Sequence, residues 1–226
     1  TAPFVSKAVG IQLAKLGAIV MSGIKIKDLN LPDKSQSNAY FSVKEAVFPF
    51  SKFPEVDVLL GPEMKSTGEV MGFGKTFGEA YFKAQRAAGV ILPKEGNVFI
   101  SVRDHDKEPI CEVASELIDM GFNVYATSGT FNYLIGAGIN CVKINKVKDG
   151  HPHIVDMIKN NEVHLIINTT EGARSIKDSF SIRKEAQNHK ISLTTTVSGA
   201  KAFCKAIKFI DDFDAQDLKQ RHNSIS

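Results

Sequence analysis

The second part of the sequence, from about residue 90 onward, alternates short apolar runs with runs whose apolar residues recur at helical spacing. The apolar runs predict five strands, at 97–102, 122–126, 140–144, 163–167 and 191–193. The amphipathic runs predict five helices, at 108–120, 131–137, 152–160, 175–187 and 197–207. Strands that alternate with helices are typical of a parallel sheet with covering helices, so we expect an α/β fold.

The first part of the sequence predicts a less regular arrangement. Its expected elements are a strand at 1–7, a helix at 10–22, a loop at 29–38, a strand at 40–50, a charged, turn-rich connector at 61–72 and a helix at 77–88. Turn residues from Pro93 to Gly96 then indicate a boundary. We therefore predict two domains, 1–89 and 90–226.

The composition narrows the class of protein. A length of 226 residues with 43% hydrophobic residues suffices for two modest cores, and a net charge of +3 is too balanced for a typical nucleic-acid binder. The sequence has no apolar run as long as a membrane span and no signal-peptide pattern. The cysteines are odd in number and lack metal-ligand spacing: Cys111, Cys141 and Cys204. We expect buried thiols and a cytoplasmic protein, and the missing initiator methionine predicts a fragment of a longer chain.

Polar residues follow four consecutive predicted strands. The turn at 127–130 joins a strand to a helix, so free helix N–H groups and two threonine hydroxyls can meet an anion there. The other strands run into 103–107, 145–146 and 168–170, which contain Lys107, Lys146 and several hydroxyl or amide groups. Because parallel strands end at one edge of a sheet, we predict a phosphate pocket at that edge. Each group alone could equally be an ordinary solvated loop residue.

Several strings resemble the large subunit of carbamoyl phosphate synthetase. In the first part, PFVSK at 3–7, SVKE at 42–45 and above all LGPEMKSTGEVMG at 60–72 resemble the end of its second ATP-grasp unit. In the second part, VYATSGT at 124–130 and INTT at 167–170 resemble its C-terminal regulatory domain. The resemblance implies an α+β remnant of an ATP-grasp domain, followed by a methylglyoxal synthase-like fold with a five-stranded parallel sheet and helices on both faces.

The resemblance also implies two effector sites. Bacterial members of this family bind nucleoside monophosphates, with UMP inhibiting and IMP activating. The matching positions are Ser101, Lys107, Thr127, Thr130, Lys146, Asn168, Thr169 and Thr170. Ornithine binds between the two domains in the family, and the matching positions are Glu45, Asp178 and Thr195. Thr194 and Ala173 depart from the family pattern, which has an acidic and a basic residue there.

Further expectations follow from the resemblance alone. The parent enzyme would make carbamoyl phosphate from bicarbonate, glutamine or ammonia, and ATP, for pyrimidine and arginine synthesis. It would use Mg²⁺ or Mn²⁺ and K⁺. The family's ATP site lies mostly upstream of residues like 3–7, so we expect this fragment to hold no catalytic residue and no cofactor. The implied partners are the rest of the large subunit and a small glutamine-hydrolysing subunit, without nucleic acid or membrane.

Two other functions compete with a regulatory role. A methylglyoxal synthase-type lyase acting on a triose phosphate could use Asp149 as base and His105 to polarise an oxygen. A subunit-assembly module could use the apolar residues near 203–213. His151 and His153 could bind a metal, but they fit better as the polar entry to a helix, since no cysteine or carboxylate at ligand spacing accompanies them. We therefore predict no metal site.

Overall fold

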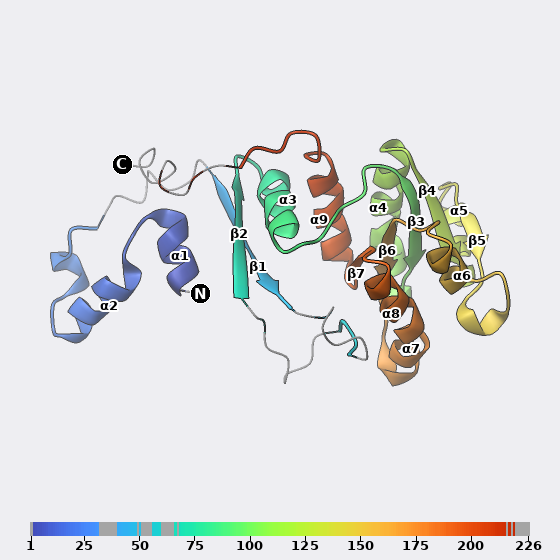
Figure 1. The fold of residues 1–226 in the computed structure, drawn as a ribbon, viewed down its shortest axis with the longest axis horizontal. Helices are drawn as coiled ribbons and strands as arrows, with labels where there is room; N and C mark the ends of the chain where they lie inside the picture. Colours follow the sequence, from blue (N-terminus) through green and yellow to red (C-terminus); the bar gives the residue numbers. More distant parts are fainter. Residues whose placement is uncertain are drawn as a thin grey trace.

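The structure is a computed structural model that describes residues 2–31, 40–48, 50, 56–59, 66, 68–215, 217 and 219. In this part of the chain, a two-stranded antiparallel sheet and a five-stranded parallel sheet lie on either side of two helices (Figure 1). These helices are α3 (Phe77–Ala87) and α9 (Val197–Ile207). The described part of the chain is thus organised around two sheets joined through a helix pair.

The chain begins with a helix, α1 (Ala2–Val9), so the strand predicted at 1–7 is wrong. The apolar residues of this short segment also fit one face of a helix, and Pro3 is tolerated in the first helical turn. Gly10, with φ of 72°, ends the helix in the left-handed conformation that glycine adopts readily.

A second helix, α2 (Leu13–Met21), confirms the helix predicted at 10–22. No single helix in the described residues is long and apolar enough to cross a membrane. Only α1 and α2 together, bent by 118°, reach that length and composition. The short 3-10 helix η1 (Ile26–Asp28) follows, and most of the loop predicted at 29–38 lies outside the described residues.

The antiparallel sheet consists of β1 (Phe41–Val47) and β2 (Gly68–Gly74). Strand β1 confirms the strand predicted at 40–50. The connector predicted at 61–72 is wrong from residue 68 onward, because those residues form a strand, and most of its earlier part lies outside the described residues.

Gly72 serves close packing rather than a turn. Helix α3, which confirms the helix predicted at 77–88, lies so close that a Cβ atom on Gly72 would be 2.0 Å from the Ala80 carbonyl oxygen. Thr76 caps the helix, because its hydroxyl accepts a hydrogen bond from the Glu79 N–H at 3.2 Å. Within β2, glycine is therefore needed at position 72 because the backbone of α3 approaches the strand too closely for a side chain.

The parallel sheet confirms the predicted fold class. Its strands run in the order β5-β4-β3-β6-β7. Their bounds are Gly96–Ser101 for β3, Phe122–Thr127 for β4, Val142–Ile144 for β5, Leu165–Asn168 for β6 and Ser192–Thr194 for β7. Each agrees with a predicted strand to within about two residues.

Helices cover both faces of this sheet. They are α4 (Lys107–Asp119), α5 (Ser128–Gly136), α6 (Ile154–Lys159), α7 (Gly172–Asp178), α8 (Phe180–Asn188) and α9, with short 3-10 helices η4 (Asp104–Asp106) and η5 (Val147–Asp149). The single helix predicted at 175–187 is two helices, because the helix is interrupted at Ser179.

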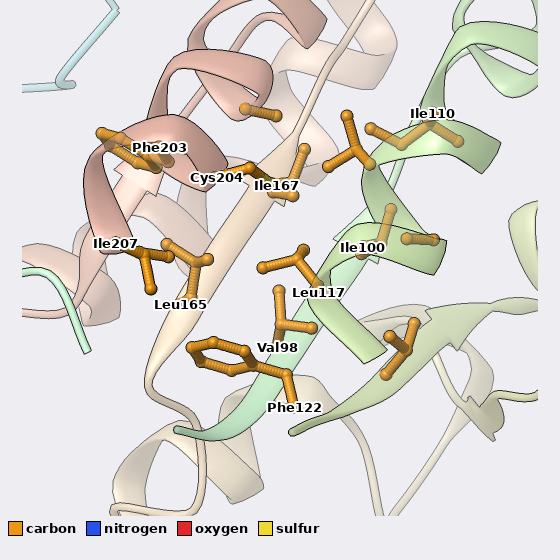
Figure 2. Close-up of a cluster of buried hydrophobic side chains, with 14 of the residues drawn as sticks. Val98, Ile100, Ile110, Leu117, Phe122, Leu165, Ile167, Phe203, Cys204 and Ile207 are labelled. Atoms are coloured by element: carbon orange, nitrogen blue, oxygen red, sulfur yellow. The ribbon is translucent and has the colours of Figure 1, made fainter. Parts of the chain in front are cut away.

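The central strand β3 separates two apolar cores. Val98 and Ile100 point into a core shared with α4 and α9, which Figure 2 shows closed by side chains such as Leu117 and Phe203. Phe99 points the other way, into a core shared with α6 and α8. All three β3 side chains are fully buried, as alternation along a strand requires when both faces are covered.

The first core extends across the predicted domain boundary. Phe82 of α3 belongs to it, and a Cβ atom on Gly78 would lie 2.5 Å from the Lys205 carbonyl oxygen of α9. The two helices therefore pack at close range. The division at residue 89 stays a prediction.

An ion pair between a buried arginine and a partly exposed aspartate makes a second connection between the two parts. Arg183 of α8, only 1% exposed, donates to both carboxylate oxygens of Asp57, at 2.7 and 2.5 Å, and to the Ile176 carbonyl oxygen at 2.8 Å. Burial alone would raise the pKa of the Asp57 carboxyl. The hydrogen bonds and charge of Arg183 outweigh burial and lower it.

The packing at Gly72 predicts that Gly72→Ala destabilises the chain by about 1–3 kcal/mol, because the added methyl would displace α3. Gly68→Ala in the same strand is the matched control, since nothing lies within 4 Å of its added Cβ. Urea unfolding of both variants measures the difference. Equal stability would show that α3 moves away at no cost.

The ion pair predicts that Asp57→Asn costs about 3 kcal/mol at neutral pH, because it leaves the Arg183 charge buried and uncompensated. The folded-state pKa of Asp57 is lowered, so its contribution is complete above its ordinary pKa of 3.8 and is lost as the pH falls through the lower folded value. Unfolding at pH 7 and pH 3 should therefore show a difference that shrinks in acid. Asp211→Asn, whose partner Lys94 is exposed, is the control and should change little.

Candidate functional site

The ends of three neighbouring strands bring together three of the predicted residues. Ser101 ends β3, Thr127 ends β4 and Asn168 ends β6, and Ser101 is the register partner of Asn168. The hydroxyl oxygens of Ser101 and Thr127 share a hydrogen bond at 3.0 Å. We call these three residues, with the loops that follow their strands, the carboxyl edge.

Two buried threonines hold the loop after β3 in place. The Thr130 hydroxyl accepts a hydrogen bond from the Val102 N–H at 3.2 Å, and the Thr169 hydroxyl accepts one from the Arg103 N–H at 3.1 Å. Each hydroxyl can still donate its own hydrogen. These two threonines therefore fix the backbone of the loop that follows β3 at the carboxyl edge.

Asn168 leaves a buried acceptor without a partner. The side chain is 1% exposed, and its amide nitrogen donates to the Ser101 carbonyl oxygen at 3.4 Å. Its oxygen has no hydrogen-bond partner in the described part of the chain. Because buried acceptors in folded proteins are nearly always paired, this oxygen is a candidate to receive a donor from a ligand. Thr170, which follows in the same loop, is half-buried.

Two lysines flank the carboxyl edge. Lys107, at the start of α4, lies 2.8 Å from an Asp104 carboxylate oxygen, and its Nζ would be 3.5 Å from a Cβ atom on Gly129. The hydrogen bond and charge of Lys107 lower the pKa of Asp104, with smaller contributions from His105 and Lys146. Lys146 therefore lies close enough to the Lys107–Asp104 ion pair for its charge to act on Asp104.

The arrangement is suited to an anion. Helix α5 begins at Ser128, directly after Thr127, three residues earlier than the sequence predicted, so its free N–H groups face the same edge. Hydroxyl groups, a helix N-terminus and lysines are the usual ligands of a phosphate group. The eight residues predicted for a nucleotide therefore lie at, or directly beneath, one edge of the sheet.

The three residues predicted for a second effector do not all meet. Glu45 and Thr195 line a cavity of about 530 Å³ between the antiparallel sheet and the β7–α8 side of the parallel sheet. Asp178 pairs with Lys148 instead, at the end of α7. Lys148 lowers the pKa of Asp178, with a smaller contribution from Lys146, so this carboxylate lies near the carboxyl edge.

Polar groups that sequence reasoning missed also line the cavity. Burial raises the pKa of Glu45 although Gln85 donates a hydrogen bond to it, and burial with the nearby Glu45 charge raises the pKa of Tyr81 to about 12. One guanidinium nitrogen of Arg183 and the amide oxygen of Gln187 have no partner among the described residues. No motif identifies the whole set, because Tyr81 and Gln85 lie on α3 whereas Arg183 and Gln187 lie on α8. The spacing of four residues within each pair is the one signal that places its two members on the same helix face.

The structure places the two histidines at the entry to a helix, where His153 caps α6, and it adds a carboxylate beside them. Asp156, absent from our sequence prediction, lies 2.6 Å from His151 and 3.1 Å from His153. Hydrogen bonds from the His153 N–H and the His151 ring lower the pKa of Asp156. A carboxylate therefore does accompany them, three residues after His153, and the helix spacing between these positions could have indicated it.

The catalytic alternative gains little from the geometry. Asp149 is exposed, and its carboxylate accepts a hydrogen bond from the Lys146 N–H at 3.2 Å as part of the η5 cap. His105 is exposed on η4. A base that abstracts a proton from carbon needs a fixed position next to the substrate, and these two groups are exposed on separate 3-10 helices.

Comparison with known proteins reveals close relatives over the whole chain. The carbamoyl phosphate synthase large chain of Pseudomonas syringae pv. tomato is 54% identical over 225 residues, which is 100% of this chain and 21% of that protein. The large chain of Pseudomonas putida is also 54% identical over the same shares, and that of Xanthomonas campestris pv. campestris is 48% identical. This chain spans about a fifth of the length of these curated relatives.

A family match locates a domain within the chain. Residues 109–195 match the family described as MGS-like domain. A solved methylglyoxal synthase from Elizabethkingia anophelis aligns with a TM-score of 0.43 and 14% identity, covering 57% of this chain and 91% of that one. Along its entire length, this chain is homologous to part of the carbamoyl phosphate synthase large chain, and its residues 109–195 match the MGS-like domain family.

Proposed function

We propose that this chain is the C-terminal regulatory part of a carbamoyl phosphate synthase large chain and that its carboxyl edge binds a nucleoside monophosphate effector such as UMP or IMP. The observation that carries the proposal is the convergence of the Ser101 and Thr127 hydroxyls, the unpaired Asn168 oxygen and Lys107 next to the start of α5. The homology over the whole chain supports it.

The parent protein's chemistry is part of the same proposal. The whole large chain would use ATP, Mg²⁺ or Mn²⁺, and K⁺ to make carbamoyl phosphate in the cytoplasm, with a small glutamine-hydrolysing subunit as partner. Residues 1–89 would be the end of its second ATP-grasp unit, and this fragment would be catalytically silent. The ligase activity would serve pyrimidine and arginine synthesis.

Regulation would operate through the contacts between the two parts of the chain. An effector at the carboxyl edge contacts the loop that begins α4, and α4 packs on α9, which in turn packs on α3. The proposed equilibrium is between two arrangements of the two parts of the chain. A ligand shifts it only by the difference between its affinities for these two arrangements. The cavity lined by Glu45 and Thr195 would hold an amino-acid effector such as ornithine at this junction.

The nucleotide site predicts that Lys107→Ala weakens UMP and IMP binding by about tenfold to a hundredfold, because a charged phosphate contact is worth about 1.5–3 kcal/mol. Lys201→Ala is the matched control, since Lys201 also pairs with a carboxylate, that of Glu112, but lies on α9. Calorimetric titration measures the affinity of each variant for UMP and IMP. Binding that is equal in the two variants would contradict the site. Turnover of dihydroxyacetone phosphate by the folded chain would favour the lyase instead.

The second effector site predicts that Glu45→Gln weakens ornithine binding by at least about tenfold, because the half-buried carboxylate is the candidate partner for an ammonium group. UMP binding should stay unchanged, since Glu45 is in the antiparallel sheet. Titration of one protein sample with each ligand separates the two sites. An equal loss of both affinities would point to misfolding rather than to a second site.

A further inference from the structure

The end of the loop between β5 and α6 and the first turn of α6 bring two imidazole rings and a carboxylate close together. The Nδ1 atom of His151 lies 2.6 Å from an Asp156 carboxylate oxygen, and the Nδ1 atom of His153 lies 3.1 Å from it. One candidate ligand atom from each residue lies within 4.8 Å of the other two. Neither the family match nor the names of the relatives assign a role to this cluster.

We propose that His151, His153 and Asp156 bind a divalent transition-metal ion of the zinc type, with a fourth position open to water. Zinc binds imidazole nitrogen and carboxylate oxygen at about 2.0–2.2 Å, so the ligand atoms of a tetrahedral site lie about 3.3 Å apart. The His153 distance to the carboxylate oxygen, 3.1 Å, is close to this value, whereas the His151 distance, 2.6 Å, is that of a hydrogen bond that an ion would replace. Movement of the exposed His151 side chain would therefore complete the geometry.

His153 can give its ring nitrogen to an ion without leaving a backbone group unpaired. In the structure this nitrogen accepts a long hydrogen bond, 3.3 Å, from the Asp156 N–H. The same N–H also donates to the His153 carbonyl oxygen at 3.0 Å. An ion at the ring nitrogen would thus replace the weaker of two bonds.

The surroundings hold two of the three ligands in position and leave the third mobile. His153 is 7% exposed, and its backbone N–H donates to the Asp156 carboxylate at 2.9 Å, which orients that group as an outer-shell bond does in metal sites. The His151 side chain is 77% exposed. His151 can therefore swing aside to admit an ion and close over it.

A bound ion would tie the start of α6 to the loop that carries Lys146. The Ile154 N–H donates to the Asn145 carbonyl oxygen at 3.3 Å, so His153 and Asn145 are already neighbours across a parallel bridge. His151 lies at the far end of the same loop. The site would therefore restrict the movement of a loop at the carboxyl edge.

The test is calorimetric titration of the metal-free, tag-free chain with Zn²⁺. We expect one ion per chain, and His151→Ala and Asp156→Asn should each weaken binding by at least about tenfold, since loss of an outer-shell partner alone costs roughly 10–100-fold. His189→Ala is the matched control, because His189 has a single carboxylate nearby, 3.8 Å away. The chain loaded with Co²⁺ should show the visible absorption of a four-coordinate ion, and this should vanish in His151→Ala.

Three outcomes would overturn the proposal. The first is no binding of Zn²⁺ by the folded wild-type chain. The second is binding that the His151→Ala and His189→Ala variants retain equally, which indicates an adventitious ion only. The third is a loss of Zn²⁺ affinity in Asp156→Asn without a loss in His151→Ala, which would show that His151 is not a ligand. His151 is exposed, so circular dichroism should show that His151→Ala folds normally.

Discussion

The structure depends on a central strand that must bury side chains on both faces. In β3, Val98 and Ile100 enter one core and Phe99 enters the other, and none of them is exposed. A strand buried in this way needs helices on each side and paired strands at each edge. Once β4 and β6 pair with it in parallel, Ser101, Thr127 and Asn168 must end at the same edge.

The polar groups at that edge are arranged before any ligand arrives. Thr130 and Thr169 hold the backbone after β3, so the loop leading to Lys107 is fixed by buried hydrogen bonds. The Asn168 oxygen has no hydrogen-bond partner among the described residues, and a buried acceptor that stays unpaired costs free energy. A ligand that donates to this oxygen would recover that cost, which is consistent with the proposed effector site.

The contact between the two parts of the chain combines an apolar and an ionic component. Glycines at 72 and 78 let α3 approach β2 on one side and α9 on the other. The Arg183–Asp57 pair adds a partly buried, directional bond, and its arginine lines the cavity. Apolar packing of this kind has few alternative arrangements, whereas an ion pair beside a cavity can be altered by a charged ligand.

The sequence by itself determined the alternation of elements and the chemistry of the carboxyl edge. Helical and strand periods place α9 at its observed bounds and each parallel strand within about two residues, because each element must present an apolar face to a core. Parallel strands share a direction, so the residues after them could be assigned to one edge. The tertiary structure decided what periodicity cannot express. It made the first segment a helix, separated Asp178 from Glu45, and brought Arg183 to Asp57. These contacts depend on where segments meet in space, and a local pattern carries no information about that.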